Sequence, residues 1–194
     1  MNELASPGQL RMAFWRWALF IVPLTALLGF ASAQIAGTGE DNPWFAALVK
    51  PDAQPPGWAF GAAWAVLYVM IGFAVSLVLN ARNAPMRWVA VGFWVAQLAL
   101  NLFWSLYFFG MHQVTSAFYL LLAIFVLAMI TTLMFGRIRA LAAWLMVPYL
   151  AWLCFASILN KQIDTLNPDA ETLIVPASQS GGALPPSQSL PPPQ

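Results

Sequence analysis

The chain has 194 residues, of which 61% are hydrophobic and only 8% are charged, and its net charge is +1. Soluble domains are about 45–50% apolar and about 25% charged, so this composition excludes an ordinary soluble domain and indicates a membrane protein. The small net charge excludes the strong positive field that nucleic-acid binding requires. One cysteine and one histidine exclude an intramolecular disulfide and a metal centre built from several such ligands.

Five apolar stretches are each about 20 residues long, enough for a helix to cross a bilayer. The predicted spans are 17–36, 58–79, 88–109, 115–135 and 141–159. Short segments with Gly, Pro or charge separate most of them, and only the first connection is long. The sequence therefore predicts an all-α, five-helix transmembrane domain over residues 1–160. For the first span a signal peptide is the alternative, because Arg11 and Arg16 precede it and ASAQ ends it.

Residues 161–194 are predicted to be a disordered tail. From about Asn167 the sequence turns to Pro, Ser, Gly and Gln, a composition that buries too little apolar surface to fold. A role in binding a partner is the alternative for this tail.

The cationic side chains are distributed unequally between the two ends of the spans. Six arginines fall on the amino-terminal side, and Lys50 and Lys161 fall on the other side. The positive-inside rule then predicts a cytoplasmic N-terminus, with the long first loop and the C-terminus outside. We expect a multi-pass protein of a bacterial cell membrane, with an outer membrane as the alternative.

Polar and aromatic residues share one face of the third span. Gln97, Asn101, Trp104 and Phe108 recur at helical spacing. A buried amide is costly in hydrocarbon, so Gln97 and Asn101 should face the bundle interior. They serve either a ligand cavity or hydrogen bonds between helices.

Two further spans carry similar aromatic faces. The residues of these faces are Gly61, Trp64, Tyr68 and Gly72 in the second span, and Trp152, Phe155, Ala156 and Leu159 in the fifth. Small residues next to aromatic rings leave space, so the three faces predict a cavity for a large, flat, apolar ligand, with aromatic core packing as the alternative. His112 is a candidate axial ligand for a haem iron, but its loop position favours a solvated side chain.

Three segments resemble the signature blocks of a known family. WFAALVKPDAQPPGWAFGAAWAVLY at 44–68, QLALNLFWSLYFFG at 97–110 and PYLAWLCFASILN at 148–160 are similar to the TspO/MBR family of tryptophan-rich sensory and translocator proteins. The resemblance covers about residues 15–160. It implies a five-helix bundle, usually dimeric, that binds porphyrins such as protoporphyrin IX, sterols and benzodiazepine-type ligands, with no obligatory cofactor.

The family pocket can be carried over onto this sequence. It falls on Trp64, Asn101, Trp104, Trp152, Ala156 and Leu159, with Tyr68, Gln97 and Phe109 nearby. The first loop is then expected to act as a lid, with Trp44 and Phe45 held over the mouth by three prolines; a merely stiff connection is the alternative. A Tyr expected after Asn160 in a sterol-recognition motif is absent, which disfavours sterol binding there.

The leading prediction is a membrane receptor or translocator of porphyrins, including protoporphyrin IX or haem, with a sensor of their level as a variant of this role. The alternative is an enzyme that degrades porphyrin with light and oxygen, using Trp64 and Trp152 as redox-active side chains. No acid–base or nucleophilic apparatus supports conventional catalysis, and ion-coupled transport ranks last because intramembrane carboxylates are missing.

A homodimer is predicted through the third span. Gly92 and Ala96 form a pair of small residues spaced for close helix approach, on a different face from the Gln97 stripe. Gly92 packing within its own chain is one alternative, and Gly29 with Ala33 is a rival pair.

Overall fold

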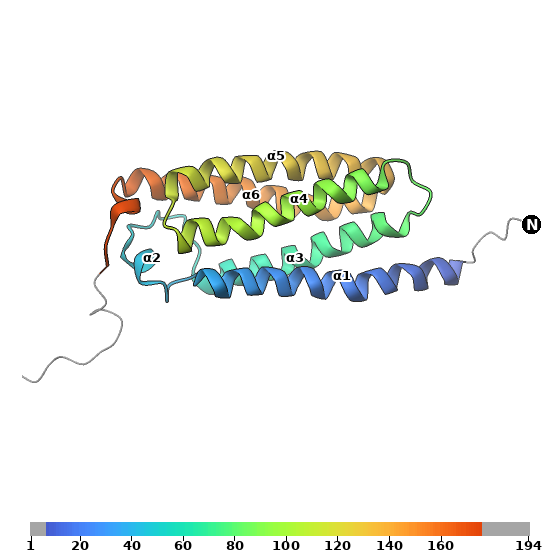
Figure 1. Ribbon diagram of the computed structural model, residues 1–194, viewed down its shortest axis with the longest axis horizontal. Helices are drawn as coiled ribbons and strands as arrows, with labels where there is room; N and C mark the ends of the chain where they lie inside the picture. Colours follow the sequence, from blue (N-terminus) through green and yellow to red (C-terminus); the bar gives the residue numbers. More distant parts are fainter. Residues whose placement is uncertain (1–6, 176–194) are drawn as a thin grey trace, which may run out of the picture.

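The computed structural model describes residues 7–175, and within this range the chain is helical without a strand. Five long helices run side by side along the long axis of the molecule (Figure 1). They are α1 (Pro7–Ala36), α3 (Gly57–Asn80), α4 (Arg87–Ser105), α5 (Val114–Ile138) and α6 (Ala140–Leu166). Each of these helices is long and apolar enough to cross a membrane, where α4 is taken together with its short continuation to Gly110. This finding confirms the predicted five-span, multi-pass fold.

The five helices form a ring around a shared interior. Helix α1 contacts α3 and α4, α3 contacts α6, and α5 lies between α4 and α6. Large side chains such as Tyr149 and Ile124 are fully buried inside, whereas Leu19, Phe20 and Leu133 are exposed on the outside. In a bilayer these outer side chains would face lipid, as expected for helices that cross a membrane.

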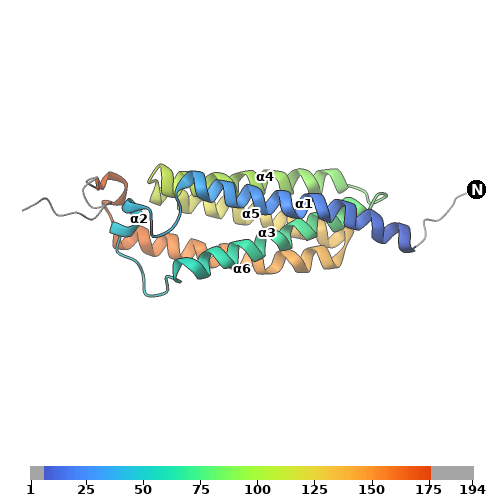
Figure 2. The same ribbon diagram turned by 90° about the horizontal axis from the view of Figure 1, so that it is seen from below.

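Helices α1 and α3 approach closely at two points. A methyl group at Gly72 would lie 3.0 Å from the backbone of Val22, and one at Gly29 would overlap the ring of Tyr68. Small residues let helix backbones pack tightly in lipid. Beyond these contacts the two helices separate towards the end of the bundle that holds the first loop (Figure 2).

Helix α4 ends in a wider turn, the π-helix η1 (Leu106–Gly110), in which the Met111 N–H donates to the Leu106 carbonyl at 2.9 Å. This turn buries both Phe108 and Phe109, which are neighbours in sequence. Single π-helical turns occur frequently at functional sites. The predicted span 88–109 is thus one continuous rod with a change of register near its end.

The arginine-bearing segments gather at one end of the bundle. The first half of α1, the α3–α4 connection and the α5–α6 connection lie together, opposite the end that holds the first loop and the last described residues (Figure 1). The unequal distribution of cationic side chains between the two ends of the spans, predicted from the sequence, is therefore present in the fold.

The long first loop is folded onto the bundle. It contains the short helix α2 (Pro43–Ala47), which Asn42 caps by accepting a hydrogen bond from the Phe45 N–H at 3.1 Å. The Asn42 amide group also donates to the Gly37 carbonyl at 3.0 Å and to the Phe109 carbonyl at 3.3 Å. One asparagine thus joins the loop to the end of the third membrane span.

The residues after α6 hold this loop in place. We call residues 167–172 the C-terminal clasp; it includes the 3-10 turn η2 (Ala170–Thr172). The Trp44 indole N–H donates to the Ala170 carbonyl at 2.8 Å, and the Asn167 side chain pairs with both backbone groups of Val49 at 2.7 and 2.8 Å. Glu171 accepts hydrogen bonds from the first two N–H groups of α5, at 2.9 and 3.0 Å.

The predicted domain boundary at residue 160 falls within helix α6. Helix α6 continues to Leu166, and the clasp after it is packed through buried Ala170. The polar side chains of Asn167 and Glu171, in the predicted disordered tail, bond to free backbone groups of the loop and of α5. The remainder of the predicted tail, 176–194, lies outside the described residues.

Candidate functional site

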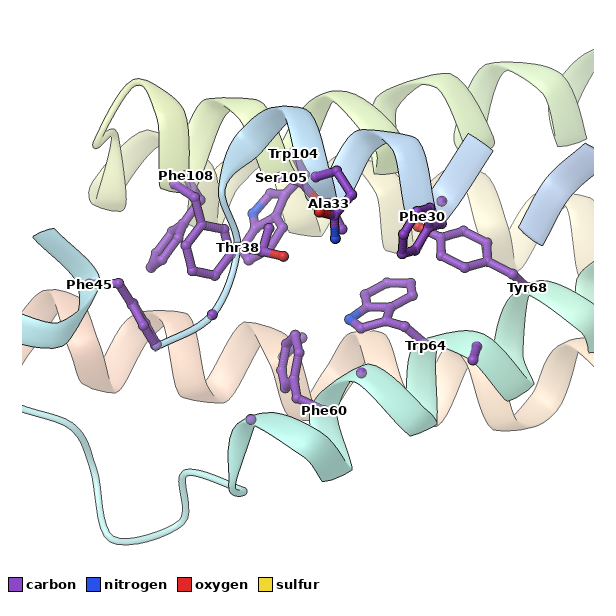
Figure 3. Close-up of a pocket in the computed structure, with 18 of the residues that line it drawn as sticks. Phe30, Ala33, Thr38, Phe45, Phe60, Trp64, Tyr68, Trp104, Ser105 and Phe108 are labelled. Carbon is purple, nitrogen blue, oxygen red and sulfur yellow. The ribbon is translucent and has the colours of Figure 1, made fainter. Parts of the chain in front are cut away.

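A cavity of about 810 Å³ opens inside the loop end of the bundle. Its walls come from α1, α3, the end of α4 with η1, and α6, and the first loop covers its end (Figure 3). Drug-sized ligands occupy pockets of about 300–1,000 Å³, so this cavity has the volume of a small-molecule site.

Six of the ten predicted ligand-binding residues line the cavity. They are Trp64, Tyr68, Trp104, Phe109, Ala156 and Leu159. They come from three segments that lie far apart in the chain: α3, α4 with its continuation η1, and α6. The faces proposed from helical periodicity therefore do converge on one space.

Flat aromatic rings form opposite walls of this space. Trp64 stacks on Tyr68 with ring centres 5.4 Å apart, and Trp104 stacks on Phe108 at 5.0 Å. Phe60 and Trp64 on α3 lie across the cavity from Trp104 and Phe108 (Figure 3). Such walls suit a flat apolar ligand, because offset stacking adds about 0.5–1.5 kcal/mol per contact beyond the burial of area.

The indole of Trp104 is fixed by its polar edge. Its N–H donates to the Ala117 carbonyl on α5 at 3.1 Å. Because a buried indole N–H needs an acceptor, this bond sets which way the ring faces. The bond ties the cavity wall to the neighbouring helix.

The two predicted amides do not line the cavity. The Tyr68 hydroxyl donates to Asn101 Oδ1 at 2.9 Å, and the Tyr149 hydroxyl donates to Gln97 Oε1 at 2.7 Å. Both amides are almost fully buried and lie behind the wall. Both amide oxygens therefore make hydrogen bonds between helices, the alternative given above, and a direct contact with a ligand stays a prediction. Asn101 acts on the cavity by orienting the ring of Tyr68.

Trp152 also lies outside the cavity. It lines a shallow apolar groove on the outer side of α3 and α6, together with Pro148 and Phe155. Its ring stands edge-on behind Trp64, with centres 6.3 Å apart at 83°. Ala156 and Leu159 of the same helix line the cavity, whereas Trp152 lies behind Trp64, and its contact with a ligand stays a prediction.

The two aromatic residues of the expected lid point in different directions. Phe45 lines the cavity, whereas Trp44 does not. Trp44 is buried against Phe108, stacks on His112 at 4.4 Å and bonds to the clasp. Trp44 therefore anchors the lid, and Phe45 closes the cavity.

Helix α1 supplies a wall that the sequence argument missed. The missed lining residues on α1 are Pro23, Ala26, Leu27, Gly29, Phe30, Ala33 and Gln34. The available signal is the spacing of Gly29 and Ala33, which by itself predicts only a rival dimer pair. In the structure Gly29 makes room for the ring of Tyr68 instead.

Other missed lining residues lie at the loop end. They are Thr38, Gly39, Glu40, Gln54, Gly57, Phe60, Gly61, Ala65, Ser105, Phe108, Asn160 and Ile163, of which Gly61 and Phe108 belonged to predicted faces. The loop residues among them, Thr38, Gly39, Glu40 and Gln54, follow no periodicity, so their approach to the helices had no signal in the sequence.

The predicted dimer residues lie on the outer surface. Gly92 and Ala96 are exposed, and a methyl group on Gly92 would meet no atom within 4 Å. Gly92 therefore does not pack within its own chain. The opposite side of the same helix carries buried Gln97 and Trp104.

His112 sits under the lid rather than in the cavity. It is partly buried against the Trp44 ring, and this burial lowers the pKa of its imidazole. It is not one of the lining residues, so the structure gives no support to the alternative of an axial haem ligand in the cavity. In the part of the chain that the structure describes, no group of three or more His, Cys, Asp or Glu could hold a metal ion.

Five span-length helices in a ring around an aromatic cavity define a multi-pass membrane protein with an internal small-molecule pocket. A sequence model of the TspO/MBR family matches residues 20–166. The chain is 36% identical over 150 residues to a tryptophan-rich protein TspO of Chlorobaculum tepidum, covering 76% of this chain and 93% of that protein. The chain belongs to the TspO/MBR family.

Relatives in that family span bacteria and animals. The chain is 36% identical over 148 residues to the human translocator protein, covering 71% of this chain and 88% of the human protein. It is 32% identical over 151 residues to a tryptophan-rich sensory protein of Cereibacter sphaeroides, covering 78% and 92% of the two chains. These matches confirm the family expected from the three sequence blocks.

Proposed function

We propose that this membrane receptor or translocator binds a porphyrin, such as protoporphyrin IX or haem, in the cavity between α1, α3, α4 and α6. The observation that carries the proposal is the arrangement of flat rings on facing walls around about 810 Å³. A conjugated macrocycle can stack on indole and phenyl faces without a metal ligand from the protein.

The direct test is a titration of the detergent-solubilised full chain with protoporphyrin IX. Binding in the cavity should quench tryptophan fluorescence saturably, since Trp64 and Trp104 line the walls. Quenching should fall when an apolar competitor of similar shape is added. Quenching that is linear in porphyrin concentration and insensitive to competitor would contradict the proposal.

Light- and oxygen-dependent degradation of the bound porphyrin is the second candidate. The contact between Trp64 on the cavity wall and Trp152 behind it favours this activity. Two indoles in contact can pass an electron from one to the other, so oxidation of Trp64 beside the ligand could be transferred to Trp152. Lasting loss of the porphyrin absorption band that requires light, oxygen and the protein would support this activity. A band that bleaches equally with free porphyrin in detergent would exclude it.

In a bacterial cell membrane, the proposed orientation places the arginine-bearing end in the cytoplasm and the cavity mouth outside. The test uses single cysteines at Ala84 and Asp52, in a background where the exposed Cys154 is serine. An impermeant thiol reagent added to intact cells should label the residue 52 cysteine and spare the residue 84 cysteine. The reverse pattern would invert the topology.

We also propose a homodimer that joins through Gly92 and Ala96. Both residues are exposed on α4, away from the cavity. Small residues on the lipid-facing side of a helix allow a second helix to approach closely.

A further inference from the structure

The ring of Tyr68 closes the inner end of the cavity on the α3 side. Tyr68 is the lining residue of α3 furthest from the first loop, and only 7% of its surface is exposed. It lies at the opposite end of the cavity from Phe45 (Figure 3). Trp104 is the corresponding last lining residue of α4, and Asn101, in the next turn of that helix away from the loop, lies behind the wall. A ligand that fills the cavity therefore meets the Tyr68 ring at its inner edge.

A hydrogen bond between helices holds the Tyr68 ring in this position. The hydroxyl donates to Asn101 Oδ1 at 2.9 Å, and both side chains are almost fully buried. Because the hydroxyl proton is used in this bond, the phenol has no proton left to donate to a ligand. The inner end of the cavity thus offers ring surface, and its position depends on the direction of one side chain.

Gly29 on α1 is the residue that allows this direction. A methyl group at Gly29 would lie 2.6 Å from Tyr68 Cζ and closer still to two other ring carbons, Cδ2 and Cε2. Carbon atoms in proteins do not approach so closely, so any side chain at position 29 would displace the ring or separate the two helices. Separation is resisted in the next turn of α3, where the backbones of α1 and α3 pack together at Gly72. The ring would instead leave Asn101 and turn into the cavity, which is the open space beside it.

We infer that Gly29 and Tyr68 together set the inner limit of the cavity, and with it the largest flat ligand that the cavity accepts. Gly29 is a positioning residue, since it acts on the ligand through the ring of Tyr68. Its lack of a side chain keeps that ring against α1, so the space in front of Trp64 stays open. The inference rests on the proposed function only in using the same cavity.

The test compares two flat hydrocarbons of different size, pyrene and the larger coronene. Neither forms hydrogen bonds, so their relative affinity reports space rather than polarity. Each is titrated into the full chain in the same non-ionic detergent, with energy transfer from tryptophan as the readout. Gly29→Ala should lower the affinity for coronene relative to pyrene by about fivefold or more, since the displaced ring occupies space that only the larger disc needs. An unchanged ratio in a folded Gly29→Ala protein would overturn the inference.

Gly72→Ala is the matched control. It adds the same methyl group to the same contact between α1 and α3, but Gly72 does not line the cavity, and the methyl group would meet Val22 and Thr25 instead of the ring. This variant should change the ratio by less than about twofold, even where its Tm falls. Equal shifts in Gly29→Ala and Gly72→Ala would assign the effect to a general loosening of the helices and overturn the inference.

A second background identifies the Tyr68 ring as the part that moves. Adding Gly29→Ala to Tyr68→Ala should change the ratio by less than about twofold, because no ring remains to be displaced. A fall as large as in the unaltered background would contradict the role of Tyr68.

Should Gly29→Ala alone fail to fold, Asn101→Leu takes its place in the test. The Tyr68 hydroxyl then loses its acceptor, and the ring should turn towards the cavity, which lowers the ratio by about threefold or more. A direct contact between Asn101 and the probes cannot produce this shift, because the hydrocarbons form no hydrogen bond. A ratio equal to that of the unaltered chain would overturn the inference.

Protoporphyrin IX titrated into the same samples separates this inference from the proposed function. If the ratio of coronene to pyrene responds to Gly29 while protoporphyrin fails to bind saturably, the porphyrin proposal falls and the size limit stands. If protoporphyrin binds saturably while the ratio ignores Gly29, the size limit falls and the porphyrin proposal stands.

Discussion

Replacing Trp64 with alanine tests most directly whether the aromatic walls hold the ligand. The indole lies on the cavity wall, stacked on Tyr68 at 5.4 Å, so one of its faces is available to a bound ring. A ligand that covers about 70 Å² of indole gains about 1.8 kcal/mol at about 25 cal/mol/Å². One stacking contact adds about 0.5–1.5 kcal/mol. Trp64→Ala should therefore weaken porphyrin binding by about 2–3 kcal/mol, or about 30- to 150-fold in Kd.

Trp152→Ala is the matched comparison, because the same side chain is removed from just behind the wall. Trp152 contacts Trp64 but does not line the cavity, so its loss should change Kd by less than about threefold, within the usual effect of a neighbouring contact. The assay is saturable fluorescence quenching by protoporphyrin IX, with size-exclusion profiles to confirm that both variants fold. Weaker binding by Trp152→Ala than by Trp64→Ala would refute the placement of the site.

Three further changes test other parts of the molecule. Gly92→Leu should convert a dimer to a monomer in mild detergent while porphyrin binding survives, because a methyl group at Gly92 meets no atom of its own chain within 4 Å. Gly72→Leu should instead disrupt folding, since a methyl group there lies 3.0 Å from the backbone of α1. A Gly92→Leu protein that stays dimeric would exclude this interface. Glu171→Ala should lower stability by about 1 kcal/mol, measured as a fall in Tm, since two N–H groups of α5 lose their carboxylate cap; an unchanged Tm would show that the cap contributes nothing. Because burial lowers the pKa of His112, the unfolded chain binds a proton at this residue more readily than the folded chain. The stability of the fold should therefore be complete above pH about 6.5 and fall as the pH drops below it. Thermal scans of His112→Gln should lose this pH dependence, and a pH dependence that persists would belong to another group.

Helical periodicity predicted which face of a helix turns inward but not what that face meets. The stripe of Gln97 and Asn101 was correctly placed inside the bundle, yet the hydroxyls of Tyr149 and Tyr68 bond to the oxygens of these two amides. Hydrogen-bond partners on other helices depend on how the helices are rotated against one another. A single helix read alone does not contain that information.

The same limit explains Trp44 and Trp152. Each was expected at the cavity because it lies in a signature block beside residues that do line it. The direction of Trp44 was decided by the Ala170 carbonyl, 126 residues away in sequence. The direction of Trp152 was decided by the position of α3 beside α6. The π-helix before Gly110 had no signal either, because a register change leaves the apolar composition unaltered.

The C-terminal clasp has a consequence for where the folding unit of this protein ends. The region matched by the family ends at residue 166, one residue before the clasp begins. A chain cut at that point would keep all five spans and every residue of the cavity wall. It would leave the Trp44 indole, the Val49 backbone and the start of α5 without their present partners. A truncated chain designed from the family boundary alone should therefore insert into a membrane normally and yet have a mouth that no longer stays shut.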